Sequence, residues 1–242
     1  MKEILNLNVK GTILIASIAP SFPAYFDCHP FQLVTALKRV GFDYVEETAV
    51  VLPDIVKKRK EICLKYKRPM LGESCPKVIE LIKTDYPHLI ENIAPIPSPM
   101  ELHGKLLHEK YGVNSETVFI SPCLHKKVEN AIKNVFDHVF TFLEIEELIL
   151  QRIRKPLNEL ELTEFDQSAS YLDRHAVLIT PYHGIGDCRN FLNHFNANGE
   201  PGFTELLFCE GGCARTALKS SSIDNTISAS EKIYMAWEEK NP

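Results

Sequence analysis

Four of the chain's seven cysteines lie where an apolar, strand-like segment gives way to a turn. An α/β protein places the groups that carry out its chemistry at such strand ends. Four thiolates are the ligand set that a 4Fe-4S cluster requires, so these side chains could hold iron and sulfide. The four residues are Cys75, Cys123, Cys209 and Cys213.

Cys209 and Cys213 form the most compact part of this pattern. Gly211 and Gly212 lie between them and let the backbone turn tightly, so that amide N–H groups can face whatever the sulfurs bind. This spacing suits a metal or a cluster better than a disulfide. The pair alone is a weak signal, because small buried cysteines are common and usually inert.

The other two cysteines each precede a predicted helix. Ser74-Cys75-Pro76 opens a helix that is expected to run to about Thr84, and Cys123 stands before Lys126 at the start of another. Because a helix N-terminus favours negative charge, we expect it to lower the pKa of the Cys75 thiol and to promote metal binding.

In chain order, the three cysteine motifs resemble the active-site signatures of the catalytic domain of iron-only, or [FeFe], hydrogenases. The motifs are Ser74-Cys75-Pro76, Pro122-Cys123-Leu124-His125-Lys126-Lys127 and Cys209-Glu210-Gly211-Gly212-Cys213. The likeness extends to residues 17–23, 36–48, 86–90 and 98–100, and it covers most of residues 11–217. It implies a two-lobed α/β fold with the metal site between the lobes.

The resemblance also implies a composite metal cofactor, the H-cluster. In that family four cysteines hold a 4Fe-4S cubane, and one of them bridges to a two-iron unit with carbon monoxide and cyanide ligands, where protons and electrons form dihydrogen. The matching cubane ligands are Cys75, Cys123, Cys209 and Cys213, with Cys213 as the bridge. Lys126 matches a lysine that donates to a cyanide, a role that suits an ammonium group in a dry cavity. Ala19 and Pro20 match the loop over the two-iron unit. The plain alternatives are a solvated lysine and a strand-ending turn.

The chain departs from the resembled family at positions that matter for proton supply. Catalytic members usually carry a proton-donating cysteine where this chain has Ser74. A hydroxyl relays protons less readily than a thiol, so turnover is expected to be slow or to use another route. Ser121 and Leu207 stand where methionines are usual. Other candidate proton carriers, each also readable as an ordinary surface or core residue, are His125, His103, Glu73 and His183.

Length and charge argue against several classes of protein. The 242 residues suffice for one large domain or two small lobes. A net charge of −5 and a pI near 6.0 argue against broad nucleic-acid binding. The short basic run Lys57, Lys58, Arg59 and Lys60 is interpreted as the wet face of a helix. No stretch approaches the ~20 apolar residues of a membrane span, so no membrane contact and a cytoplasmic location are expected.

Cysteine usage indicates a reducing compartment. Seven cysteines at irregular spacing fit thiolate ligands rather than a disulfide framework. Cys28, Cys63 and Cys188 are scattered singly and are expected to be small buried residues. Because the sequence has no second cysteine array, electrons would enter from an external carrier such as ferredoxin. The two-iron unit would need maturation proteins.

The hydrophobic pattern predicts an α/β fold: two lobes, each with a mainly parallel sheet flanked by helices, and a metal site in the cleft between them. Three prolines in residues 92–100 are expected to divide an N-terminal lobe, residues 1–97, from a C-terminal lobe, residues 98–242, without a ferredoxin-like accessory domain. Predicted strands cover residues 11–18, 42–51, 117–120, 138–142, 175–180 and 204–208. Predicted helices cover residues 30–40, 53–67, 76–84, 98–111, 126–135, 144–154, 186–195 and 227–239.

Three functions stay open at this point. The favoured one is a minimal hydrogenase that interconverts protons plus electrons and dihydrogen, because Lys126 and the Ala19-Pro20 loop are needed only with a two-iron unit. The second is a low-turnover sensory hydrogenase-like domain, because a serine in place of the donor cysteine, as at Ser74, resembles the regulatory members of the family. The third is a 4Fe-4S electron-transfer protein without the two-iron unit.

Overall fold

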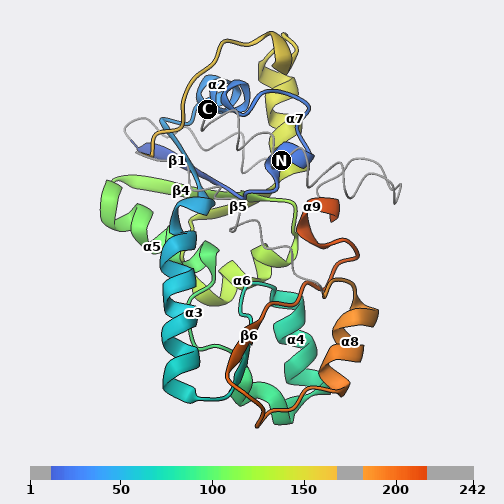
Figure 1. The fold of residues 1–242 in the computed structure, drawn as a ribbon. Helices are drawn as coiled ribbons and strands as arrows, with labels where there is room; N and C mark the ends of the chain where they lie inside the picture. Colours follow the sequence, from blue (N-terminus) through green and yellow to red (C-terminus); the bar gives the residue numbers. More distant parts are fainter. Residues whose placement is uncertain (1–11, 168–181, 217–242) are drawn as a thin grey trace.

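The protein contains two parallel β-sheets, seen in a computed structural model that describes residues 12–167 and 182–216 (Figure 1). The four-stranded sheet has the order β2-β1-β4-β5, and the second sheet pairs β3 with β6. These strands are β1 (Ile13–Ile18), β2 (Tyr44–Glu47), β3 (Pro69–Leu71), β4 (Ser115–Ser121), β5 (His138–Thr141) and β6 (Gly202–Thr204).

Helices surround both sheets, as expected for parallel strands (Figure 1). In Figure 1, α2 (Pro30–Val40) and α7 (Phe142–Arg152) lie on one side of the four-stranded sheet, and α5 (Pro99–Tyr111) lies on the other. The second sheet lies among α3 (Leu52–Tyr66), α4 (Pro76–Asp85) and α8 (Ile185–Asn193), and the remaining α-helices are α6 (His125–Lys133) and α9 (Gly212–Thr216). Within the described ranges, 3-10 helices cover Phe22–Ala24, Thr48–Val51, Pro87–Asn92 and Leu157–Glu159.

The central strand β1 explains why this sheet is stable. Its residues Ile15, Ala16 and Ile18 are fully buried, because β1 pairs with β2 on one edge and with β4 on the other while helices cover both faces. A strand that is buried on both faces reads as an unbroken apolar run, which is how the sequence predicted it. The predicted fold class is therefore confirmed.

The two sheets do not follow the predicted division at residue 97. β1 and β2 precede that residue and pair with β4 and β5, which follow it. The second sheet likewise joins β3 to β6 across more than a hundred residues. Each half of the molecule is thus built from both parts of the chain, because parallel strands cannot be joined by a tight turn and are linked through long crossover connections.

Two predicted strands differ from the structure. β2 stops at Glu47 because β1 ends opposite it at Ile18, and the chain continues as the 3-10 helix Thr48–Val51. The strand predicted over residues 204–208 is wrong beyond Thr204, since β6 covers Gly202–Thr204 and the Thr204 carbonyl oxygen accepts a final bond from the Gly72 N–H at 2.8 Å. The predicted strand at 175–180 and the predicted helix at 227–239 lie outside the described residues.

The predicted helices at the site agree well with the structure, since Pro76 begins α4 and His125 begins α6. Within residues 12–167 and 182–216, none of the helices is long and apolar enough to cross a membrane.

Candidate metal centre

Cys75 is held at the start of a helix. It follows β3 and is the N-cap residue of α4, with Pro76 in the first turn. Backbone N–H groups of Phe208, Val78 and Lys77 face its thiol. Burial nevertheless raises the pKa of Cys75, and these N–H groups only partly oppose that effect. The expected lowering of this pKa was wrong, because the desolvation of the half-buried sulfur outweighs the helix N-terminus.

Cys123 lies between the end of β4 and the start of α6. The Ser121 hydroxyl accepts the Cys123 N–H at 3.3 Å, and the Cys123 carbonyl accepts the Lys126 N–H at 3.2 Å. Burial raises the pKa of the Cys123 thiol, while the backbone of His125 and the charge of Lys126 lower it. The sulfur thus faces N–H donors and an ammonium group, which stabilise an anionic thiolate.

The Cys209–Cys213 loop depends on its two glycines. Gly211 and Gly212 have φ angles of 68° and 71°, a left-handed conformation that side chains other than glycine rarely adopt. The Gly212 N–H donates to the Cys209 carbonyl at 2.9 Å, and the Gly211 N–H donates to His183 Nδ1 at 3.2 Å. The prediction of a tight turn here is confirmed, and His183 holds that turn.

The four cysteines lie close enough to interact electrostatically. The pKa of Cys213 is raised to about 12, first by burial and then by the neighbouring thiols of Cys75, Cys123 and Cys209. The thiol of Cys209 also raises the pKa of Cys123. Although Cys213 is the most exposed of the four, burial is the main cause of its shift.

Among the described residues, no three His, Cys, Asp or Glu side chains lie close enough to hold one metal ion. In a 4Fe-4S cluster each cysteine binds a different iron atom, so the four sulfurs of such a cluster lie farther apart than the ligands of one ion.

Lys126 supplies the positive charge of the site. Its ammonium interacts with Cys75, Cys123 and Cys213 and lowers the pKa of each thiol. Its Nζ atom donates to the Ser74 carbonyl at 3.0 Å and to Glu129 Oε2 at 2.6 Å, and only 14% of the side chain is exposed. The alternative of a solvated lysine does not hold for Lys126, whose ammonium group bonds to two acceptors among the described residues.

Ser74 belongs to a buried ionic cluster that sequence reasoning missed. Its hydroxyl lies 3.0 Å from Arg59, 3.2 Å from Glu73 and 3.1 Å from Glu205, and Arg59 pairs with both carboxylates. Arg59 also lies over the ring of Phe203, with 4.4 Å between its guanidinium carbon and the ring centroid. Burial is the main reason that the pKa of Glu205 is raised.

No local signal could have found this cluster. Arg59 comes from the run that was interpreted as the wet face of a helix, yet it is 6% exposed, while Lys57 and Lys60 are exposed. That interpretation was wrong for Arg59 because every fourth position of α3 faces the second sheet. Its partner Glu205 lies 146 residues away.

Ala19 and Pro20 lie on the same edge of the four-stranded sheet as Cys123. The Ala19 N–H donates to the Ile120 carbonyl at 2.8 Å, so the loop after β1 runs beside the end of β4. Parallel strands bring their carboxyl ends to one edge, which explains how these residues meet.

The remaining candidates divide between the site and the core. Cys188 is fully buried, and its thiol lies 3.4 Å from the Leu207 carbonyl. The pKa of Cys188 is raised to about 11, mainly by burial and then by Cys75. His103 is buried away from the cysteines, between Ser17 and Glu46, and it is a core histidine. Cys28 and Cys63 are partly buried, so their expected full burial is not met.

Comparison with known proteins identifies the family. The model of the iron only hydrogenase large subunit, C-terminal domain, matches residues 12–179, more than half of the 242 residues. A cytosolic Fe-S cluster assembly factor, NAR1 of Botryotinia fuckeliana, is 30% identical over 81 residues, which are 31% of this chain and 14% of that protein.

Solved structures establish the fold. The chain resembles HydA(deltaEFG), a structure that reveals stepwise [FeFe]-hydrogenase H-cluster assembly, with a TM-score of 0.76 at 16% identity, over 96% of this chain and 88% of that one. A variant of the [FeFe]-hydrogenase HydA1 from Chlamydomonas reinhardtii gives a TM-score of 0.74 at 17% identity, with the same coverage. By the family match and the shared fold, this chain belongs to the family of the iron only hydrogenase large subunit, C-terminal domain.

Proposed function

We propose that the chain is a redox protein of this family that holds a 4Fe-4S cluster. The ligands are Cys75, Cys123, Cys209 and Cys213. The observation that carries the proposal is the mutual influence of the four thiols, which come from three separate loops. When bound, the cluster supplies reversible one-electron transfer.

The surroundings of the thiols support an anionic cluster. Four thiolates carry four negative charges, and burying them requires nearby donors. Backbone N–H groups at the starts of α4 and α6 face Cys75 and Cys123, and the Lys126 ammonium lies near three of the four sulfurs. These donors lower the cost of ionising the thiols before iron binds.

The test is anaerobic reconstitution of the full chain with iron and sulfide. We expect about four iron atoms per chain and a visible absorption band that reduction bleaches. Each of four Cys→Ser variants at the ligand positions should lower the iron content. The matched controls are Cys188→Ser, a buried thiol beside the site, and Cys63→Ser on α3. An equal iron content in all six variants would contradict the proposal.

Hydrogen turnover at an added two-iron unit is the second candidate, and the placement of Lys126 beside Ser74 favours it. The hydroxyl of Ser74 contacts Arg59, Glu73 and Glu205, so it takes part in a buried ionic cluster. A serine is also a poorer proton donor than a cysteine. We therefore infer that any hydrogen turnover is slow.

Infrared spectroscopy separates these candidates after the chain is matured with the synthetic two-iron precursor. Carbonyl and cyanide bands with dihydrogen evolution support a hydrogenase, and bands with negligible evolution support a sensor. If the 4Fe-4S cluster is present but no such bands appear, the result supports electron transfer. It also fits a role in iron–sulfur cluster assembly, like the role named for the NAR1 relative. Ser74→Cys should increase dihydrogen evolution if proton supply limits the rate, and an unchanged rate would remove that explanation.

The proposed partners follow from the cofactor. A lone cubane needs an external electron carrier such as ferredoxin, and a two-iron unit needs maturation proteins. Mixing the reconstituted chain with reduced ferredoxin tests the first, because the visible absorption of the cluster should bleach without a chemical reductant.

A further inference from the structure

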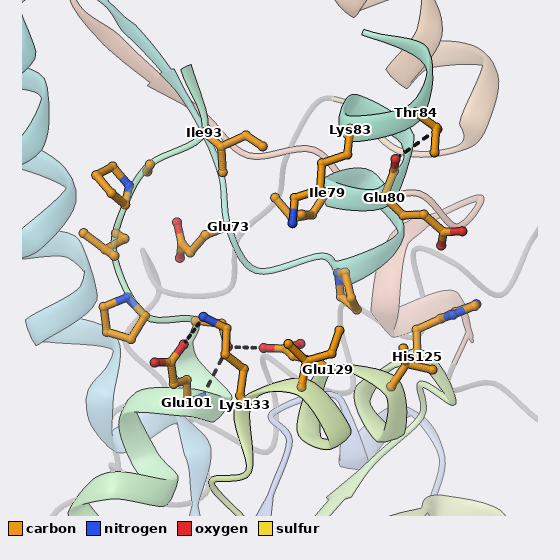
Figure 2. Close-up of a pocket in the computed structure, with 18 residues that line it drawn as sticks. Glu73, Ile79, Glu80, Lys83, Thr84, Ile93, Glu101, His125, Glu129 and Lys133 are labelled. Carbon is orange, nitrogen blue, oxygen red and sulfur yellow. Dashed lines mark hydrogen bonds and ion pairs between the residues drawn. The ribbon is translucent and has the colours of Figure 1, made fainter. Parts of the chain in front are cut away.

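A cavity of about 760 Å³ lies beside the metal centre, between α4, residues 93–98 and the facing parts of α5 and α6 (Figure 2). Its volume is in the range of small-molecule sites, about 300–1,000 Å³. None of the four proposed ligand cysteines lines it, and neither do Lys126 and Ser74. It is therefore a separate hollow, not the place of the cluster.

Much of the cavity wall is aliphatic. Ile79 of α4, Ile93 and Ile96 of the proline-rich segment, and Val128 and Ile132 of α6 line it. Val128 and Ile132 are 56% and 77% exposed, and α6 has no buried residue of its own. A ligand with an aliphatic body would remove this apolar surface from water, which is favourable.

Most charged residues of the lining already have partners. Glu101 pairs with Lys105 and Lys133. Glu129 bonds to Lys126 and Ser98, and Glu80 pairs with Lys77. These groups need no ligand to satisfy them.

Glu73 and Lys83 are two further charged residues of the lining. Glu73 Oε1 bonds to Arg59 and Ser74, but among the described residues Glu73 Oε2 has no hydrogen-bond partner, although only 6% of the side chain is exposed. Lys83 is exposed to water and has no ion pair with any of the described residues. In Figure 2 the Lys83 side chain extends from α4 toward the side of the hollow on which Glu73 lies.

Arg59 lies beneath the cavity and faces the carboxyl groups of Glu73 and Glu205. A cationic donor that entered the cavity would bond to Glu73 Oε2. Lys83 would bind an anionic group at the other end of the same molecule.

We propose that this cavity binds a small zwitterion with an aliphatic body, such as an apolar amino acid or dipeptide. Its ammonium group bonds to Glu73 Oε2, its carboxylate pairs with Lys83, and its aliphatic part contacts the walls of α4 and α6. The site is independent of the proposed redox function, because no proposed cluster ligand lines it.

Calorimetric titration of the full, cluster-loaded chain with the dipeptide Leu-Leu tests the proposal. N-acetyl-Leu-Leu lacks the ammonium group, and Leu-Leu amide lacks the carboxylate. Each capped form should bind on the order of tenfold more weakly, since a hydrogen bond to a charged group is lost. Repeating the titration with the metal-free chain should give the same order of affinities.

Variants assign each end of the ligand. Lys83→Gln should abolish the preference for the free carboxylate and keep the preference for the free amine. The matched control is Lys65→Gln, an exposed lysine on α3 outside the cavity, which should change neither. Glu73→Gln should abolish the preference for the free amine. If Glu73→Gln fails to fold, Lys83→Gln still tests the proposal, because it changes an exposed residue.

Two results would overturn the proposal. One is no binding of Leu-Leu up to about 10 mM, well above the dissociation constant of an ordinary small-molecule site. The other is binding that neither the caps nor Lys83→Gln alters.

Discussion

The Nζ atom of Lys126 lies 3.0 Å from the carbonyl oxygen of Ser74. This bond joins two of the cysteine motifs, since Lys126 is three residues after Cys123 and Ser74 directly precedes Cys75. The same ammonium lies 2.6 Å from Glu129 Oε2, so one side chain links two loops and neutralises a carboxylate. Lys126 thus supports the site even without a bound cofactor.

Replacing Lys126 with Gln should destabilise the metal-free chain by about 1–3 kcal/mol. The change leaves Glu129, whose side chain is 11% exposed, without its cation. Urea unfolding measures this loss. The control is the neighbouring Lys127→Gln, whose pair with Glu144 is partly solvated and should be worth ~1 kcal/mol or less. Equal losses in both variants would contradict a structural role for Lys126.

Replacing Arg59 with Met should cost about 3–5 kcal/mol in the free energy of unfolding, because it breaks the buried ion pairs of Arg59 and leaves Glu73 without its cation. Urea denaturation again provides the value. Arg39→Met is the matched control, since Arg39 and Glu161 are both well exposed and their pair should contribute little to stability. A small effect at Arg59 would mean that the two acids are neutral in the folded chain.

Glu205 should make stability depend on pH near neutrality. Burial raises its pKa from 4.5 to about 7, against the effect of Arg59. A raised pKa means that the folded chain holds this proton more tightly than the unfolded chain does. The stability from Glu205 is therefore complete below about pH 4.5 and is lost as the pH rises through about 7. The wild type should lose stability relative to Glu205→Gln across this window, and parallel pH curves would refute the assignment.

Glu46 should act in the opposite direction at acid pH. Burial favours its neutral form, but bonds from His103, Lys110 and Tyr111 outweigh burial and lower its pKa from 4.5 to about 2. Stability from Glu46 is present above about pH 4.5 and is lost as the pH falls toward about 2.

This lowering of the Glu46 pKa corresponds to about 3 kcal/mol, since a shift of one pKa unit is worth about 1.36 kcal/mol. Acid unfolding of Glu46→Gln should lack this loss, while Glu116→Gln, which changes a partly exposed carboxylate on β4, should keep it. Identical acid profiles for the wild type and Glu46→Gln would count against the prediction.

His183 should control how firmly the Cys209–Cys213 loop holds a cluster, because its Nδ1 atom accepts the Gly211 N–H. His183→Ala removes that acceptor and should speed cluster release to a chelator roughly fivefold, as expected for about 1 kcal/mol. His183→Asn keeps an acceptor and should release the cluster more slowly than His183→Ala. Exposed His194→Ala is the control. Loss of visible absorbance reports the rate, and equal rates in all variants would exclude this role.

The cysteine motifs and most secondary elements could be predicted from the sequence. The glycines of the Cys209–Cys213 loop, the proline that begins α4 and the apolar run of β1 are local signals, since each depends on residues within one turn or strand. The order of the motifs also indicated the family. Local sequence predicted the wrong direction for the pKa of Cys75, because the sequence shows the helix N-terminus but not the protein that buries the thiol.

Only the tertiary structure decided how the two sheets divide the chain and which charges meet. β1 and β4 pair across the predicted boundary, and Arg59 meets Glu205 across 146 residues. The same is true of Lys126 and Ser74, and of the cavity between Glu73 and Lys83. Such contacts depend on which surfaces are buried against one another when the whole chain folds, and no short stretch of sequence contains that information.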